Sequence, residues 1–195
     1  IILLLPTCLP PTNLLAGTST TSTATFSWTA STSNPAFGSE YFYDVANTPP
    51  TATTTPTGSV GVGVTTESIA GLSPLTTYYV WVRSNCSPVD QSPWSGPIAF
   101  TTQCAAFSAP FVESFNTSTT PQCWSNTGVE TWQFSNTQPG YGPAAEHTGN
   151  SGYFAWVDDS SPNNIGTTLT SPIIDISTLT NPRLRFYIYS NNTNT

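Results

Sequence analysis

Positive charge is nearly absent from this sequence. Its 195 residues contain no Lys, and three Arg face ten acidic residues, which gives a formal net charge of −7. A protein that binds a nucleic-acid backbone needs clustered Lys and Arg to displace counterions, and attraction to an anionic membrane surface needs similar clusters. Three Arg supply neither. We therefore exclude nucleic acid and anionic membranes as partners.

Long apolar runs are also missing. The apolar run at residues 1–5 is much too short to span a bilayer, so we expect no membrane insertion. Only 7% of the residues are charged, whereas 35 Thr and 24 Ser supply hydroxyls to the surface. The 6 Trp, 8 Tyr and 10 Phe are too many aromatic residues for a disordered chain, so the chain is expected to fold.

Proline, glycine and cysteine indicate the class of fold and the compartment. The 18 Pro and 13 Gly are spread along the chain, which favours many short strands over long helices and predicts an all-β protein. The four Cys are an even number that fits two disulfides. Disulfides persist in oxidising surroundings, so we expect an extracellular or cell-surface location.

Alternating apolar residues mark strands in the first half of the chain. Such alternation is typical of strands with one buried face. Between the alternating stretches lie loops rich in Pro, Thr and Gly, which predicts about seven strands at the spacing of a β-sandwich. The three clearest stretches are Ala24, Phe26 and Trp28, then Tyr41, Tyr43 and Val45, then Tyr78, Val80 and Val82.

Residues 71–78, Gly-Leu-Ser-Pro-Leu-Thr-Thr-Tyr, resemble the E–F corner of a fibronectin type III domain. In that family a Tyr hydroxyl bonds to upstream backbone and holds the turn between the two sheets. Tyr78 matches the corner Tyr, Trp28 the core Trp of the second strand, and Pro11 with Leu14 the first strand. The resemblance implies a fibronectin type III domain over residues 8–102.

A parity argument pairs two of the cysteines in this domain. Each hairpin reverses the chain, so the sixth strand ends at the pole where the first strand begins. Cys8 precedes the first strand and Cys86 follows the sixth, so we predict a Cys8–Cys86 disulfide. On the chain-entropy model, closing so long a loop stabilises the fold by about 4 kcal/mol.

Arg83 is the only cation of the first domain and shares a strand face with Trp81, while Trp94 follows in Ser-Pro-Trp-Ser. The arrangement resembles half of the Trp-Ser repeat of cytokine-receptor type III domains, in which Arg and Trp side chains interleave. One interpretation is a structural cation–π stack worth about 0.5–1 kcal/mol at an exposed site. The alternative is an aromatic face that binds sugar or protein.

The second half of the chain begins with Cys104 to Phe115, followed by Cys123 and Trp124. This resembles the opening of a MAM domain, a jelly-roll sandwich in which the two Cys are bonded, so the resemblance implies a Cys104–Cys123 disulfide. Further similarities to that family lie at residues 147–158, 169–172 and 184–186. We expect a MAM-like jelly-roll domain over residues 103–195 that lacks its last strands and so leaves open edges.

The candidates for chemistry are few. His147 is the only His, so any nucleophilic triad would need it, and no elbow motif surrounds it. We expect no catalysis. Four carboxylates, Glu113, Glu146, Asp158 and Asp159, lie in the second domain and could bind Ca²⁺ as hard oxygen ligands. The alternative is that Asp158 and Asp159 form a solvated turn.

The order of domains suggests the function. We expect residues 1–7 to be the end of a preceding module or a linker, and the whole to be cut from a longer polypeptide. A fibronectin type III domain before a MAM-like domain resembles the surface regions of large secreted proteins of the Bacteroidetes type, exported by type IX secretion. The resemblance implies a non-catalytic adhesion or spacer segment that contacts surface proteins, glycans or the outer-membrane secretion machinery.

Two other functions remain open at this stage, because fold does not determine function. The domains could be glycan-binding accessory modules of a secreted hydrolase. They could also form a subunit of a surface filament.

Overall fold

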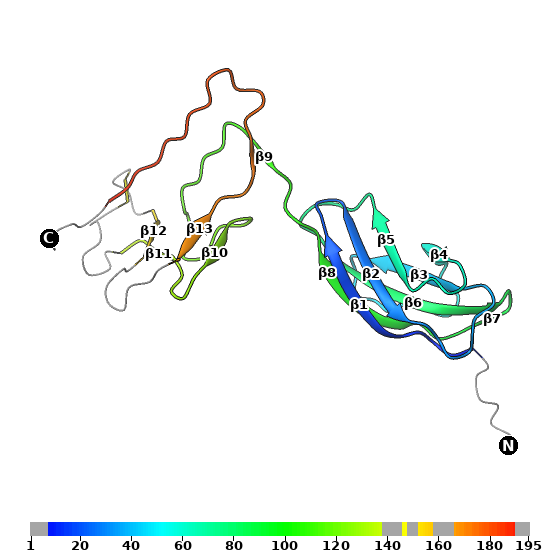
Figure 1. Cartoon of the computed structure of the whole chain (residues 1–195). Helices are drawn as coiled ribbons and strands as arrows, with labels where there is room; N and C mark the ends of the chain where they lie inside the picture. The colour runs from blue at the N-terminus through cyan, green and yellow to red at the C-terminus, as the bar shows by residue number, and fades with distance from the viewer. Residues whose placement is uncertain (1–7, 138–145, 148–151, 158–165, 190–195) are drawn as a thin grey trace. The chain divides into compact units, whose positions relative to one another are not determined.

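A computed structural model describes residues 8–137, 146–147, 152–157 and 166–189, and this part of the chain is built from β-strands alone (Figure 1). The prediction of an all-β protein is confirmed. The chain divides into two compact units, Ile1–Ala105 and Ala106–Thr195. Within the described ranges, no helix of a length and apolar character suited to crossing a membrane occurs.

Unit 1 is a sandwich of two antiparallel sheets. One sheet has the order β1 (Thr12–Ser19), β2 (Thr23–Thr29), β5 (Thr66–Ala70). The other joins β4 (Gly58–Val60), β3 (Ser39–Asp44) and β6 (Thr77–Ser87), and β6 also pairs with β7 (Asp90–Gln91) and β8 (Ser95–Thr101). This strand order is that of a fibronectin type III-like fold, in which three and four main strands form the facing sheets.

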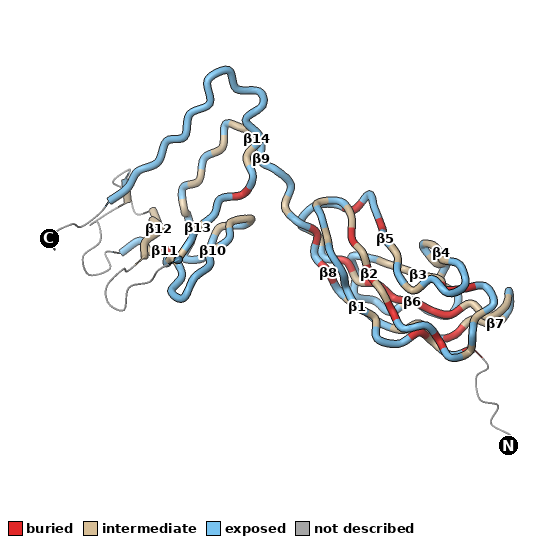
Figure 2. The backbone as a smooth tube through the Cα atoms, in the orientation of Figure 1, coloured by how far each residue is buried: buried red, intermediate tan, exposed pale blue. Residues whose placement is uncertain are grey.

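The core of unit 1 follows from alternation in its strands. Successive strand residues point to opposite faces, and in β2 the residues Ala24, Phe26 and Trp28 are all buried, as the sequence predicts. Figure 2 shows the buried positions gathered along these strands. The main buried cluster contains nine residues, namely Ala24, Phe26, Trp28, Ile69, Leu72, Tyr78, Val80, Val82 and Phe100.

The structure corrects one of the predicted stretches. Tyr41 and Tyr43 pack against the core, but Val45 is exposed because β3 ends at Asp44. The Asp44 carboxylate accepts the Val45 N–H, at 2.6 Å, and turns the chain out of the sheet. Unit 1 also has eight strands where about seven are expected, since the very short β7 pairs with the end of β6.

The turn before β6 is a tyrosine corner. The Ser73 N–H donates to the Tyr78 hydroxyl at 2.9 Å. Thr102, which is buried after β8, donates its hydroxyl to the Ser73 carbonyl and accepts the Thr76 N–H. Gly71 has φ +75°, a left-handed conformation that glycine adopts at little cost. These bonds hold the connection between the two sheets in the manner typical of the fold.

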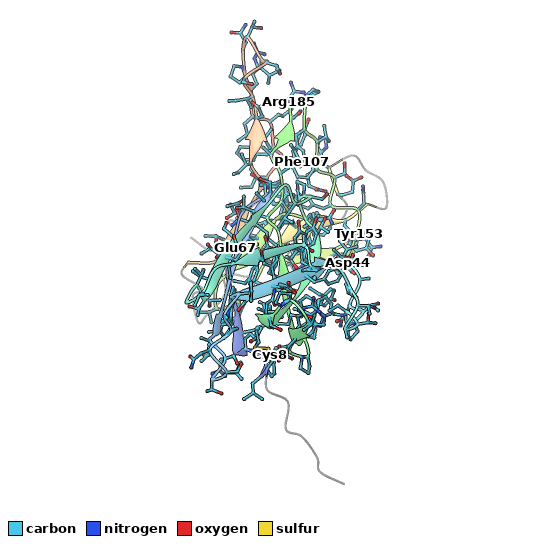
Figure 3. All side chains as sticks on the ribbon, turned by 90° about the vertical axis from the view of Figure 1, so that its right-hand side faces the viewer. Cys8, Asp44, Glu67, Phe107, Tyr153 and Arg185 are labelled. Atoms are coloured by element: carbon cyan, nitrogen blue, oxygen red, sulfur yellow. A yellow bond between two sulfur atoms is a disulfide. The ribbon has the colours of Figure 1, made fainter. Side chains whose placement is uncertain are left out.

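The chain passes through unit 1 from one pole to the other. Cys8 lies where the chain enters, before β1 (Figure 3), and is bonded to Cys86 with their Cα atoms 5.8 Å apart, which is the pair given by the parity argument. At the opposite pole Ser19, the last residue of β1, donates its hydroxyl to the carbonyl of Thr101, the last residue of β8. The entry and exit of the chain therefore lie at opposite ends of the sandwich.

Unit 2 contains three separate strand pairs in its described residues. β10 (Ser125–Thr127) pairs with β13 (Thr168–Thr170), and β11 (Gln133–Ser135) pairs with β12 (Phe154–Trp156), both antiparallel. β9 (Phe107–Ser108) pairs in parallel with β14 (Ile174–Asp175). Phe134 is buried, where it packs 5.6 Å from Phe115 between ring centroids. The unit is all-β with small sheets.

The strand expected at residues 184–186 does not belong to a sheet. The backbone of residues 183–189 pairs with no other described strand, and its large side chains are exposed. The alternating pattern therefore indicates a strand that has no neighbour within the described part of unit 2, and a strand needs a second strand to satisfy its N–H and C=O groups.

Replacing Tyr78 with Phe removes the acceptor of the Ser73 N–H and leaves the rings in place. We expect Tyr78→Phe to lower the free energy of unfolding of unit 1 by about 1–2 kcal/mol, measured by urea denaturation. Tyr79→Phe is the matched control, because no hydrogen bond joins the Tyr79 hydroxyl to another described residue. Equal stability of the two variants would contradict the role of the corner.

Candidate functional site

The outer face of the larger sheet in unit 1 carries a charged and aromatic cluster. In the register of β3 against β6, Glu40 lies opposite Arg83 and Phe42 lies opposite Trp81. These pairs point away from the core because they alternate with Tyr41 and with the core valines of β6. Cross-strand neighbours on one face of a sheet interact directly, so the register brings acid to base and ring to ring.

Arg83 uses its guanidinium group on three partners. Its Nε donates to Oε2 of Glu40 at 2.7 Å, and Nη1 donates to the carbonyl of Ala52 at 2.9 Å. Cζ lies 4.5 Å from the centroid of the Trp94 ring. Asn85 donates to the other carboxylate oxygen of Glu40, so both oxygens of this carboxylate accept a hydrogen bond. A charge this deeply buried needs acceptors close to it, and both Nε and Nη1 have one.

A connecting segment covers the cluster. We call residues 45–57, between β3 and β4, the strap. Its backbone carbonyls at Thr51 and Ala52 accept from the Trp94 indole N–H and from Arg83, at 2.9 Å each. Trp81 is 1% exposed although it lies on the side of β6 away from the core. Both faces of β6 are therefore buried.

The aromatic rings on this face of the sheet form a continuous row. Phe42 lies 6.0 Å from Trp81 and 6.4 Å from Trp94 between ring centroids, and Tyr79 lies 6.5 Å from Trp81. Their spacing is that of packed aromatic pairs. The contact of Arg83 with the Trp94 ring fits the structural stack, the first of the two interpretations of Arg83.

The remaining cysteines are also bonded. Cys104 and Cys123 both form a disulfide, and no described cysteine is free. Since Cys8 and Cys86 are bonded to each other, Cys104 and Cys123 form the second bridge. Two disulfides in a short chain favour an oxidising compartment.

The predicted metal ligands are only partly described. Glu113 accepts the Phe115 N–H at 2.7 Å, a local bond that shapes the turn. Asp158 and Asp159 lie outside the described residues. Among the described residues no group of three His, Cys, Asp or Glu is close enough together to bind a metal ion. Calcium binding stays a prediction.

Three further polar side chains are His147, Tyr41 and Asp175. The His147 imidazole stacks on the Tyr187 ring. Burial, and after it the charges of Glu67 and Tyr43, raises the pKa of the Tyr41 hydroxyl. Hydrogen bonds from the side chain and backbone N–H of Ser177 lower the pKa of Asp175. These two shifts have local causes and bring no acid next to a base.

Unit 2 has a shallow pocket of about 320 Å³. Its lining residues include Gln133 of β11 and Trp156 of β12, which lie opposite each other in the strand register and so share a face. Glu130 and Thr131 lie beside them. The Trp156 indole N–H is buried without an acceptor among the described residues. An aromatic ring beside an amide and a carboxylate can bind a sugar, since the ring contacts its apolar face and the polar groups bind hydroxyls.

Sequence analysis missed Glu40, the strap and this pocket. Glu40 had one available signal, an acid within an aromatic strand, next to Tyr41 and away from the core face. The strap had no sequence signal, since it accepts hydrogen bonds through backbone carbonyls, which any residue could supply. The pocket gave none either, because Gln133 and Trp156 lie far apart in the sequence.

No protein-family model and no curated protein matches this chain. Among solved structures, a chain titled "Myokine structure" is 20% identical, with a TM-score of 0.39, over 49% of this chain and 98% of that one. The FN1–FN3 domains of chicken CNTN1 are 22% identical, with a TM-score of 0.40, over 48% of this chain and 31% of that one. A computationally redesigned β-sandwich protein is 23% identical, with a TM-score of 0.36, over 49% of this chain and 91% of that one. The fold of unit 1 rests on its own strand order and tyrosine corner.

Replacing Arg83 with Met leaves the Glu40 carboxylate under the strap without its cation. We expect Arg83→Met to lower the free energy of unfolding of unit 1 by about 3 kcal/mol, because breaking a buried pair costs more than the pair contributes. The double variant Arg83→Met, Glu40→Gln should recover part of the loss in a calorimetric scan. Arg185→Met, at an exposed cation, is the control, and an equal effect of the two Arg variants would refute the assignment.

Proposed function

We propose that this chain is a non-catalytic adhesion and spacer segment of a large secreted cell-surface protein. The observation that carries the proposal is the path of the chain through unit 1, which enters beside Cys8 and leaves beyond Thr101 at the opposite pole. A module with its ends at opposite poles extends a polypeptide in a line. The two disulfides support an extracellular setting.

The finer parts of the proposal come from resemblance. The MAM-like identity of residues 103–195 and export by type IX secretion rest on the sequence motifs of the two domains. In that setting, unit 1 holds the contact surfaces of neighbouring modules away from the cell, and its partners are surface proteins, glycans or the secretion machinery during export.

The exit of unit 1 is well anchored, which suits a spacer under tension. Thr102 is buried, and its N–H donates to the Thr76 carbonyl at 3.1 Å. Gln103 donates to Thr20 at 2.9 Å and accepts from Leu75 at 3.2 Å. Backbone bonds therefore hold the chain to the sandwich until it reaches Cys104.

The Cys8–Cys86 disulfide determines how far the module can extend. A pull on the two ends of unit 1 reaches Cys8 and passes through the disulfide to Cys86, so the 78-residue separation between them carries no load. Only the residues after Cys86, which include β7 and β8, can be drawn out of the fold. The bridge makes unit 1 a spacer of limited extensibility.

Single-molecule stretching between the two ends tests this load path. With the disulfide intact, unfolding of unit 1 should release only the short segment after Cys86. In reducing buffer, or in the Cys8→Ser, Cys86→Ser variant, the released length should grow by about 270 Å, at about 3.5 Å per residue over 78 residues. Equal lengths under both conditions would overturn the proposal. The experiment depends on unit 1 alone.

The pocket of unit 2 favours a second candidate function, that of a glycan-binding accessory module. Its support is the Trp156 residue, which lines the pocket together with Gln133 and Glu130. This function needs a catalytic domain elsewhere in the polypeptide.

Affinity electrophoresis in gels containing xylan, mannan or mixed-linkage β-glucan tests the glycan function. If it is correct, at least one polysaccharide retards the protein, and Trp156→Ala weakens the binding at least about tenfold, the equivalent of about 1.4 kcal/mol. Trp94→Phe, in unit 1, should bind as the unchanged protein does. No retardation by any of the three, or retention by Trp156→Ala, would contradict this function.

A further inference from the structure

Residues 183–189, Arg-Leu-Arg-Phe-Tyr-Ile-Tyr, form an unpaired strand-like segment, which we call the edge segment (red end of the colour bar in Figure 1). Its large apolar side chains are strongly exposed, with Leu184 at 86%, Phe186 at 70% and Ile188 at 82%. Figure 3 shows Arg185 in this part of unit 2. No backbone hydrogen bond joins the edge segment to another described residue.

An exposed segment of this kind is well suited to pairing. Its unpaired N–H and C=O groups are the donors and acceptors of a β-ladder, and natural proteins protect such edges because they attract other strands. In an extended backbone Leu184, Phe186 and Ile188 share one face. The other face then carries Arg183, Arg185, Tyr187 and Tyr189. The edge segment therefore has one wholly apolar face and one face with two cations followed by two phenols.

We propose that the edge segment pairs antiparallel with the edge segment of a second copy of this chain, with Phe186 opposite Phe186. In this register Leu184 lies opposite Ile188 of the second copy, on the apolar face. On the other face Arg185 lies opposite Tyr187, and Arg183 opposite Tyr189. Each residue meets one of complementary chemistry.

Charge selects this register over its neighbours. Arg183 and Arg185 are two of the three cations of the chain, and no salt bridge joins either to another described residue. Centring the pair on Arg185 would place two guanidinium groups opposite each other, and a parallel in-register pair would do so twice, which is destabilising. With Phe186 at the centre, each Arg meets a Tyr ring, to which a guanidinium is attracted. One of these rings, Tyr187, also stacks on His147 of its own chain, so Arg185 of the second copy would approach its other side.

Parity excludes another set of registers. A shift by one residue would place Arg185 opposite Phe186 and Leu184 opposite Tyr187, so neither face of the ladder would stay uniform. The Phe186-centred pair instead brings six apolar side chains together on one face. The resulting contact is isologous, with a twofold axis through the Phe186 pair, which is the commonest symmetry of protein dimers.

The expected affinity is low. A ladder of seven residues on each side provides less contact than the roughly 1,200–2,000 Å² of a stable interface, so we expect a dissociation constant on the order of 100 μM. Weak contacts of this kind gain strength when many copies are arrayed on one surface. The inference uses only unit 2, so it can fail while the spacer function of unit 1 stands.

Sedimentation equilibrium of the whole chain, from low micromolar to near-millimolar concentration, tests the association. The unchanged chain should dimerise, and Phe186→Lys should weaken dimerisation at least about tenfold, because it places two ammonium groups at the centre of the ladder. Val112→Lys is the matched control, since Val112 is a similarly exposed apolar residue of the same unit. A chain that stays monomeric, or an equal loss with Val112→Lys, overturns the proposal.

Disulfide trapping tests the register. Phe186→Cys should form a covalent dimer under mild oxidation, because residues at the centre of the ladder face their own copies at about 4.5–5.5 Å between Cβ atoms. Leu184→Cys and Ile188→Cys should cross-link when mixed but not alone. Self-linking of Leu184→Cys as fast as that of Phe186→Cys overturns the register. Protection of the edge segment from hydrogen exchange in a monomer would show that the same polypeptide covers it, and would also overturn the proposal.

Discussion

Burial of β6 on both faces is the constraint on which unit 1 depends. One face contributes Val80 and Val82 to the space between the two sheets, and the other holds Trp81 and Arg83. A strand at the surface of a two-sheet sandwich needs only one apolar face. Because the second face holds a cation, its burial requires an anion, a backbone acceptor and an aromatic ring, and the neighbouring segments supply all three.

This requirement explains why segments distant in sequence are ordered together. Glu40 belongs to β3, Ala52 to the strap and Trp94 to the turn before β8, and each is tied to the same guanidinium group. Few other charges are present, so one ion pair organises a surface that in most proteins would hold several. The outer face of the sheet is consequently a second, smaller core.

The two units differ in how they place their polar groups and their apolar side chains. In unit 1, hydroxyls and backbone groups bond to one another, as in the Ser19–Thr101 and Thr102–Ser73 contacts, and two sheets enclose the apolar side chains. In unit 2, the described strands form pairs of two or three residues, and large apolar side chains from Val112 to Tyr189 are exposed. Unit 1 thus encloses its apolar side chains, whereas the described part of unit 2 exposes many of its own.

The sequence by itself determined the all-β class of the fold, the buried face of its strands in unit 1 and the Cys8–Cys86 bond. Alternation at Ala24, Phe26 and Trp28 predicted a buried face, and the motif ending at Tyr78 predicted a corner with a hydroxyl bond, because both signals are local. The Cys8–Cys86 pair followed from counting strand reversals, which needs no coordinates.

Only the tertiary structure brought Arg83 to its partners, since the sequence left both a structural stack and a binding face open to it. Those partners depend on the strap, whose carbonyls carry no sequence signal, and on the register that places Glu40 opposite Arg83. The same holds for Gln133 and Trp156, which become neighbours only when β11 pairs with β12. Periodicity along a chain reports which face of a strand is apolar, but what covers the opposite face is determined by segments distant in sequence.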